Sequence, residues 1–254
     1  MIFPNFSNGI KRIWEEDEVS QSHYLSIIGE ETRNLPLEIF QRFNAFFVPN
    51  NDYLKIYFGN EVTRLDYELY DSNGNCCLNN CIVFPCYTLT NRIAGWVAYN
   101  PLVKLQSVQE NNFMMNYYSY PSKYTFNKKD YLFILPDVYK KALQDGYLIL
   151  VDGVFDSISF CYYGLNAASL LGSYLNINLA FYLKFIGKIF VAIDNDEAGL
   201  KMLHAVQRFI PHAKVIRQGY KKDADDILKT ELRNKYISQI LAGIEQYTDV
   251  FFKA

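Results

Sequence analysis

The sequence predicts an α/β fold, with a mostly parallel central sheet flanked by helices and a smaller α+β subdomain preceding it. Half of the 254 residues are hydrophobic, which is enough to form a substantial buried core. After residue 145, continuous apolar runs alternate with amphipathic segments, a pattern typical of βαβ units in a parallel sheet. Before that point, two strand-like runs flank a short Thr/Asn turn, as in an antiparallel hairpin.

This change of pattern predicts two domains, residues 1–144 and residues 145–254. In the first domain, residues 35–44 have the spacing of a short amphipathic helix. The apolar face of this helix consists of Leu35, Ile39, Phe40 and Phe43. The two strands of the hairpin are expected at residues 81–87 and 92–99.

The second domain is expected to be built on buried strands joined by right-handed crossovers. The strands are expected at residues 147–151, 167–171, 188–193 and 213–218. Helices are expected between them, at residues 154–163, 175–186 and 197–210. The last helix should turn one apolar face inward, made of Leu200, Leu203, Val206 and Ile210.

The composition excludes several classes of protein. A formal net charge of −2 argues against a broad nonspecific coat for polyanions, although local basic patches remain compatible with it. The N-terminus lacks the ordered regions of a signal peptide. Residues 157–183 contain no charged side chain, but Gly, Asn and Ser interrupt the stretch, so a transmembrane helix is not expected. We expect a soluble, cytoplasmic protein that does not bind a membrane.

The cysteines are clustered, with four of the five between Cys76 and Cys86 and the fifth at Cys161. The cluster lacks the paired Cys-x₂-Cys halves of a zinc site, and part of it falls in an expected strand. Free thiols are therefore expected, without structural zinc.

Acidic side chains follow the ends of successive expected strands. Asp152 and Asp156 follow the first strand, and Asp194 and Asp196 follow the third. A further pair after the last strand consists of Asp223 and Asp225. In parallel sheets, ligands bind beyond the carboxyl ends of the strands.

Each pair alone has an ordinary interpretation, since Asp is common as a helix N-cap. Three pairs at one sheet edge are harder to explain in this way, because converging carboxylates repel each other and lose solvation. A hard divalent cation removes that penalty, and Mg²⁺ prefers oxygen ligands. No His accompanies the acids, which argues against zinc or a His-carboxylate iron site.

The segments LILVDGVFDSIS, GLNAASLLG, IFVAIDNDEAGLK and KKDADDIL resemble the successive motifs of the Toprim domain in bacterial and phage-type DNA primases. The D-x-D-x-A-G turn is the most specific of them. Upstream, CIVFPCYTLTNRIAGWVAYN and PSKYTFNKKDYLF are similar to the primase segments that precede Toprim, and the helical segment that begins at residue 23 also matches. The resemblance covers residues 23–245 in the correct order.

This resemblance implies a DNA primase, a nucleotidyltransferase that makes short RNA primers on single-stranded DNA from NTPs during DNA replication. The implied catalytic residues are Asp152, Asp156, Asp194 and Asp196, with Asp152 as metal ligand or general base. The implied ligands of two or more Mg²⁺ or Mn²⁺ ions are Asp194, Asp196, Asp223, Asp225 and Asp156.

The resemblance also implies substrate contacts. Lys123, Tyr124 and Lys128 would contact the template or nucleotide, and Lys221 and Lys222 would hold a phosphate. The lysines could equally be a solvated loop, or could balance the neighbouring acids. Gly153 and Gly199 would allow the backbone close to the phosphates.

The sequence departs from the family pattern at three places. The first motif normally begins with Glu, where this chain has Asp152. The family often has Arg where Cys81 and Tyr99 stand. No counterpart is found for the zinc-binding module or the helicase-binding region, so a separate zinc-binding protein and a replicative helicase are expected partners. A Toprim nuclease and a non-catalytic nucleic-acid-binding module remain alternatives.

Overall fold

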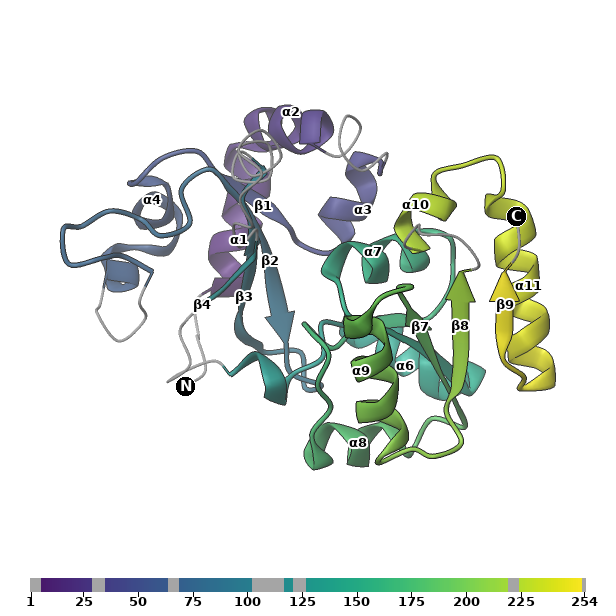
Figure 1. The fold of residues 1–254 in the computed structure, drawn as a ribbon. Coiled ribbons are helices and arrows are strands. Elements are labelled where there is room, and N and C mark those ends of the chain that lie inside the picture. The colour runs from purple at the N-terminus through teal and green to yellow at the C-terminus, as the bar shows by residue number, and fades with distance from the viewer. Residues whose placement is uncertain are drawn as a thin grey trace. The chain divides into compact units, whose positions relative to one another are not determined.

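The computed structural model describes residues 6–28, 35–63, 69–101, 117–120, 127–218 and 224–252 (Figure 1). The chain forms two compact units, Met1–Asn127 and Lys128–Ala254. Within the described residues, no helix is long and apolar enough to span a membrane. The predicted α/β fold, with an α+β subdomain before the parallel sheet, is confirmed.

The first unit is built on an antiparallel sheet in the order β1-β2-β3-β4. Its strands are β1 (Phe46–Val48), β2 (Cys81–Tyr87), β3 (Ile93–Tyr99) and β4 (Tyr117–Tyr120). Its helices are α1 (Phe6–Glu16), α2 (Glu18–Ile28), α3 (Leu37–Arg42), α4 (Tyr53–Phe58) and the 3₁₀ helix η2 (Asn60–Thr63). The strands β2 and β3 form the predicted hairpin, and every residue of both strands is buried.

Aromatic side chains fill the core of this unit. The Trp96 ring lies 4.7 Å from the ring of Phe6 and 6.1 Å from that of Phe46. The four apolar residues predicted for the short helix, Leu35, Ile39, Phe40 and Phe43, are all buried. Burial of these large rings is the main source of stabilisation for the unit.

The second unit is built on a five-stranded sheet in the order β6-β5-β7-β8-β9, in which every pair of neighbours is parallel. Its strands are β5 (Tyr147–Val151), β6 (Ala167–Ser169), β7 (Lys188–Ile193), β8 (Lys214–Gln218) and β9 (Val250–Phe252). Its helices are α6 (Pro136–Asp145), α7 (Val154–Tyr162), α8 (Ile177–Leu183), α9 (Glu197–Gln207), α10 (Ala224–Leu228), α11 (Arg233–Gln246) and the 3₁₀ helix η4 (Lys128–Asp130). The last helix, α11, lies beside β9 (Figure 1).

The second unit begins earlier in the chain than residue 145, where the sequence analysis divides the domains. Phe133 and Ser169 exchange backbone hydrogen bonds of 2.8 and 3.0 Å, which joins the segment before α6 to the edge strand β6. A division at residue 144 would also cut α6, which ends at Gly146 in a left-handed conformation with φ 73°. This helix was not predicted from the sequence.

The predicted inward face of α9 is correct at Val206 and wrong at Leu200. Its buried residues are Gly199, Met202 and Val206, whereas Leu200 is 39% exposed. Ile210 is buried as predicted but lies beyond the end of the helix. Gly199, the residue before Leu200, is buried close to the backbone of the preceding loop at Asp194.

The five cysteines carry free thiols, as predicted. Cys81 and Cys86 lie within β2 and are buried, and Cys76 and Cys161 are buried as well. Burial raises the pKa of the Cys76 thiol to about 11 and that of Cys81 to about 12. Buried thiols with raised pKa values behave as small apolar side chains rather than as nucleophiles.

Candidate metal and nucleotide site

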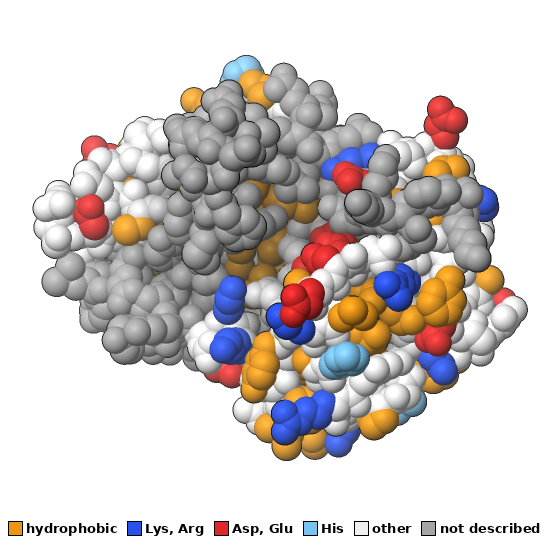
Figure 2. Space-filling view, viewed as in Figure 1, with side chains coloured by type: hydrophobic (Ala, Val, Ile, Leu, Met, Phe, Trp, Pro, Cys, Tyr) orange, Lys and Arg blue, Asp and Glu red, His pale blue; other side chains and the backbone are white. Residues whose placement is uncertain are grey.

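The acidic residues after β5 and β7 leave the sheet at the same edge. These strands are parallel neighbours, with Leu148 opposite Ile189 and Leu150 opposite Val191. Asp152 therefore emerges beside Asp194, as the strand order predicts. Figure 2 shows acidic side chains gathered near the N-terminal end of α9, with basic side chains around them.

The backbone of Asp152 is held by the turn that follows β6. The hydroxyl of Ser169 donates a hydrogen bond of 2.7 Å to the Asp152 carbonyl oxygen, and the Gly172 N–H donates one of 3.1 Å to the same oxygen. The Leu171 N–H in turn donates to the Ser169 hydroxyl at 2.9 Å. The half-buried Asp152 carboxylate thus extends from a backbone position that two donors fix.

The second acid of this pair, Asp156, lies in the first turn of α7 and packs over Gly153. A Cβ atom on Gly153 would lie 2.6 Å from Oδ2 of Asp156, so the carboxylate occupies the space that a side chain would need. Gly153 precedes the helix with an extended backbone, φ −95° and ψ 150°. A larger residue at position 153 would require the Asp156 carboxylate to move from its present position.

The turn after β7 carries Asp194, Asn195 and Asp196. Asp196 is the N-cap of α9, and its Oδ1 accepts a hydrogen bond of 2.7 Å from the Gly199 N–H. A Cβ atom on Gly199 would overlap the carbonyl oxygen of Asp194. The capping interpretation is therefore correct for Asp196, and Gly199 makes the tight turn possible. Asp194 is half-buried and Asp196 exposed.

A basic residue that the sequence analysis did not identify lies at the same edge. Arg217 is paired with Ile193 in the parallel register of β7 and β8. Its Nε donates a hydrogen bond of 2.8 Å to Oδ1 of Asn195. Its position in the sequence could have identified it, because Arg217 lies near the end of the apolar run of β8, at the strand end where the acids collect. Ser169 was also not predicted, because a small residue within a strand is usually explained by packing alone.

Several predicted residues cannot be placed. Asp223, Lys221, Lys222, Lys123 and Tyr124 lie outside the described residues. Asp225 belongs to α10, but the position of its side chain is not described. Lys128 is exposed at the start of η4. The roles of these residues stay predictions.

The donor set is compatible with magnesium rather than with a closed metal cage. Among the described residues, no three His, Cys, Asp or Glu side chains lie together as ligands for one ion. Mg²⁺ usually keeps several waters and binds one or two carboxylates together with substrate phosphates. The carboxylates of Asp152, Asp156, Asp194 and Asp196 meet that lower requirement, and all four supply oxygen alone.

Residues 149–228 match the family model described as Toprim-like. The "DNA primase" of Aquifex aeolicus is 31% identical over 121 aligned residues, which cover 44% of this chain and 24% of that protein. The matched part is therefore well under half of that relative's length.

Solved structures share the fold over a longer stretch. A DNA primase domain from Pseudomonas aeruginosa is similar with a TM-score of 0.71 and 18% identity, over 96% of this chain and 82% of that one. A DnaG primase catalytic domain bound to ssDNA is similar with a TM-score of 0.67 and 18% identity, over 92% and 81% of the two chains. The chain therefore has the fold of a bacterial-type DNA primase catalytic core, with a Toprim-like segment at residues 149–228 that carries the acidic pairs after β5 and β7.

Proposed function

We propose that this chain is a DNA primase, which joins ribonucleotides into short primers on a single-stranded DNA template in a divalent-metal-dependent reaction. One observation carries the proposal. Within a Toprim-like segment of a primase-core fold, Asp152, Asp156, Asp194 and Asp196 follow two adjacent parallel strands at one sheet edge. This arrangement suits the binding of hard cations and phosphates, and its donor set contains no nitrogen or sulfur ligand.

The residues that would hold two or more Mg²⁺ or Mn²⁺ ions are Asp194 and Asp196, with Asp156 and the predicted pair Asp223 and Asp225. Such ions, when bound, orient the triphosphate of the incoming nucleotide and neutralise charge as pyrophosphate leaves. Oδ1 of Asp196 accepts the hydrogen bond from the Gly199 N–H, and Oδ2 would bind the ion.

Asp152 is the proposed general base or metal ligand next to the attacking 3′-hydroxyl. A base in this role must be held in place, and Ser169 and Gly172 hold the Asp152 backbone through its carbonyl oxygen. In this role Asp152 would accept the proton on its carboxylate, Oδ1 or Oδ2.

Arg217 is proposed to attract the anionic nucleotide to this edge. Its guanidinium is exposed and is oriented by the hydrogen bond from Nε to Asn195, so its remaining N–H groups can meet phosphate oxygens.

Template and partner contacts are proposed from the resemblance. Lys123, Tyr124 and Lys128 would contact the strand or nucleotide, and Lys221 and Lys222 would hold a phosphate. The similar DnaG domain that is bound to ssDNA supports a single-stranded partner. A helicase and a separate zinc-binding protein belong to the same proposal; in the similar Aquifex aeolicus primase structure, a zinc-binding domain accompanies the RNA polymerase domain of the same protein.

Synthesis is preferred over nucleolytic cleavage because the likeness is not confined to the Toprim-like segment. It covers 96% of the chain and so includes the antiparallel first unit. A nuclease that shares only the Toprim geometry would not require that unit.

The test is a primer-synthesis assay with single-stranded DNA, NTPs and Mg²⁺ or Mn²⁺. Wild type is compared with Asp194→Asn/Asp196→Asn and with Glu231→Gln/Glu245→Gln, a matched pair of neutralised acids elsewhere in the second unit. We expect short RNA from wild type and the control, and a loss of about 10²-fold or more in the Asp194/Asp196 variant.

Two outcomes would overturn the proposal. Release of labelled DNA fragments with Mg²⁺ and no NTP incorporation would show a nuclease. Failure of wild type to extend even a preformed primer on a template would show a non-synthetic binding module, because extension does not require a partner for initiation.

A further inference from the structure

One face of α8 in the second unit is apolar and exposed. The side chains of Ile177, Phe181 and Phe185 are 70%, 57% and 62% exposed. A spacing of four residues places them in one row along the helix and the turn that follows it. Tyr174, just before the helix, and Tyr182, beside Phe181, are half-exposed. These five side chains form the α8 patch.

The opposite face of α8 belongs to the core of the second unit. Leu179, Ala180 and Leu183 are buried, as is Ile186 just beyond the helix. The helix is therefore apolar on both sides, and a helix of that kind is normally covered on both sides.

The rings of the α8 patch lie against one another. Phe181 and Phe185 are arranged edge to face with ring centroids 5.4 Å apart, and the Tyr182 ring lies 6.0 Å from that of Phe181. Side chains of this size, about half exposed, present about 500 Å² of apolar surface. An area of this size matches the largest apolar patch of a typical monomeric protein, and such patches commonly mark contact surfaces.

The chemistry of the α8 patch favours a protein partner over a nucleic acid. Aromatic side chains around a centre without charge are typical of the core of a protein interface. A surface for single-stranded DNA instead combines aromatic rings with cations that follow the phosphate backbone. Residues 170–187, which contain the patch, include one charged residue, Lys184, and it lies at the C-terminal end of the helix.

The two ends of α8 carry opposite charges. At the N-terminal end, Nδ2 of Asn176 donates a hydrogen bond of 2.7 Å to Oδ1 of Asp130, which holds this exposed carboxylate beside the first turn. At the C-terminal end, Lys184 is exposed and forms no ion pair with another described residue. Two copies of α8 that lie antiparallel would therefore bring Lys184 of each copy near Asp130 of the other.

We infer that the α8 patch is the interface of a symmetric homodimer, in which α8 packs antiparallel against α8 of a second copy. Phe181 is midway between Ile177 and Phe185, so it lies at the two-fold axis and contacts its own counterpart. Ile177 of each copy then faces Phe185 of the other. A two-fold interface uses the same surface on both copies, and this pairing covers the apolar row and matches the charges at its ends.

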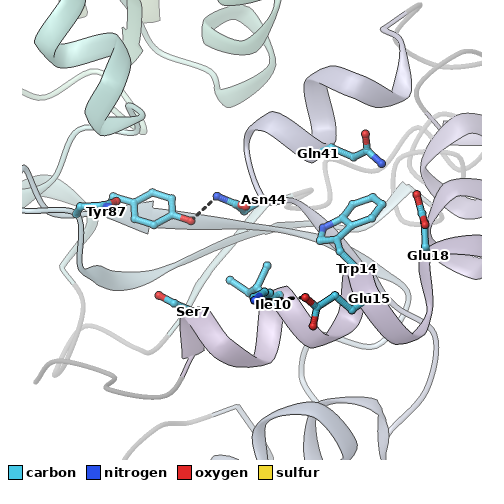
Figure 3. A pocket seen from close by; sticks show the side chains of 10 residues that line it. Ser7, Ile10, Trp14, Glu15, Glu18, Gln41, Asn44 and Tyr87 are labelled. Carbon is cyan, nitrogen blue, oxygen red and sulfur yellow. Dashed lines mark hydrogen bonds and ion pairs between the residues drawn. The ribbon is translucent and has the colours of Figure 1, made fainter.

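The pocket in the first unit offers no comparable match to one partner. It has a volume of about 520 Å³ and lies between α1, α3 and the end of the hairpin (Figure 3). Part of its polar lining is already paired, with a hydrogen bond of 2.8 Å from Nδ2 of Asn44 to the Tyr87 hydroxyl and an ion pair of 3.4 Å between Lys11 and Glu15. The remaining lining does not distinguish one class of ligand from another.

Sedimentation equilibrium of the whole chain at a series of concentrations tests the dimer. An interface with about 500 Å² of apolar surface on each side is smaller than the standard of about 800 Å² per partner, so we expect a reversible dimer with a Kd on the order of 10 µM. The average mass of wild type should rise from that of one chain to that of two as the concentration passes through this value.

Substitution at the two-fold axis should have the largest effect. Phe181→Asp places two carboxylates opposite each other in an apolar contact and should weaken the dimer about 100-fold or more. Leu241→Asp, the same kind of change at a half-exposed apolar position on α11, should leave the Kd unchanged. Far-UV circular dichroism checks that each variant is folded.

Charge reversal tests the antiparallel orientation. Lys184→Asp and Asp130→Lys each place like charges together at both ends of the interface and should weaken the dimer about tenfold. The double variant Lys184→Asp/Asp130→Lys should recover most of the lost affinity, because opposite charges face each other again.

Several results would overturn the inference. These are a wild-type chain that stays monomeric well above the expected Kd, a dimer that Phe181→Asp leaves intact, equal weakening by Leu241→Asp, and a double charge variant no tighter than either single one. A monomeric wild type whose affinity for single-stranded oligo(dT) falls in Phe181→Asp would show that the α8 patch binds nucleic acid instead. None of these measurements uses metal or NTPs, so the outcome is independent of primer synthesis.

Discussion

Two glycines in the second unit leave room for groups on which the candidate site depends. Gly153 makes space for the Asp156 carboxylate, and Gly199 allows the backbone of α9 to approach that of Asp194. From the sequence, both glycines were predicted to let the backbone approach the phosphates, as glycines in such turns commonly do. The contacts within the chain supply a sufficient reason for both positions.

Replacement of Gly199 by Ala should destabilise the second unit. Alanine in a helix normally gains about 1 kcal/mol over glycine, but the added Cβ overlaps the Asp194 carbonyl oxygen. Overpacking of this kind costs about 1–3 kcal/mol and should outweigh the gain. Urea unfolding followed by far-UV circular dichroism measures the change, and primer synthesis should fall with it because Asp194 is displaced.

The matched control is Gly187→Ala. Gly187 is exposed, and a Cβ atom on it would lie 3.3 Å from the Gly146 carbonyl oxygen. This variant should stay within about 0.5 kcal/mol of wild type. Equal stability of Gly199→Ala and Gly187→Ala would show that the turn after β7 can move without penalty.

Asp152 stands where the family pattern has Glu, and substitution there tests whether the shorter acid is functional. Asp152→Asn removes the negative charge and should lower primer synthesis by about 10²–10⁴-fold, as expected for loss of a general base or metal ligand. Asp152→Glu keeps the charge and should stay within about tenfold of wild type. The rate of primer extension is the measurement, with Asp137→Asn, an exposed acid at the start of α6, as control.

The activity of the Asp152→Asn variant distinguishes a catalytic role of Asp152 from a purely structural one. If Asp152→Asn and wild type extend primers equally well, Asp152 serves only to end β5. In that case the Ser169 and Gly172 hydrogen bonds to its carbonyl oxygen have a purely structural purpose.

In the helix α9, one side chain is assigned both a structural and a chemical role. Asp196 caps the helix through Gly199 and is also a proposed metal ligand. Asp196→Asn keeps a side-chain acceptor for the cap, so unfolding should change by no more than a few tenths of a kcal/mol. Asp196→Ala removes the cap and should cost about 1 kcal/mol. Both variants should lose primer synthesis to a similar extent, because both lose the carboxylate.

Urea unfolding and primer extension on the same samples make this comparison. If Asp196→Asn retained full activity while Asp196→Ala did not, the cap alone would matter. The metal role would then fall to Asp194 and the remaining acids.

The positions of the buried strands and the parallel arrangement of the second sheet were the most predictable part of this chain. The strands β5 and β7 are continuous apolar runs, and such runs are typical of strands buried on both faces of a parallel sheet. The acids that follow them were therefore located correctly at one edge. The strand β9 was missed, since Val250–Phe252 is too short to show a pattern.

Contacts between elements were harder to predict than the elements themselves. The predicted inward face of α9 was wrong at Leu200, which is 39% exposed, whereas Gly199 is buried against the Asp194 backbone; apolar spacing gives no signal for a buried glycine. Arg217 was missed because its significance comes from pairing with Asn195 on the neighbouring strand end. A single sequence carries no signal for a contact of that kind.

At the scale of the whole molecule, the first unit is distinguished by buried thiol and phenol groups whose pKa values are raised. Burial raises the pKa of Cys76 to about 11, and those of Cys81 and Tyr87 to about 12. Burial also raises the pKa of Tyr53, whose hydroxyl donates to Asp17 at 2.7 Å. Each of these groups is neutral when protonated, so the folded unit strongly prefers the protonated form.

This preference predicts that the first unit loses stability at alkaline pH. Because the folded-state pKa values are raised, the stabilisation is complete below about pH 8, where the unfolded thiols are also protonated. It declines as the pH rises from about 9 to about 12, since the unfolded chain then releases protons that the folded chain keeps. By pH 10.5 a thiol such as Cys81 should account for about 2 kcal/mol of the loss.

Tryptophan fluorescence measures this transition in the first unit alone, because Trp14 and Trp96 both lie in it. The urea midpoint should fall between pH 8 and pH 10.5, and Cys81→Ala should make the fall shallower. Cys77→Ala, which changes a partly exposed thiol, should leave the slope as in wild type. A midpoint that does not depend on pH in wild type would mean that these thiols and phenols ionise without unfolding the unit, and hence that water reaches them in the folded state.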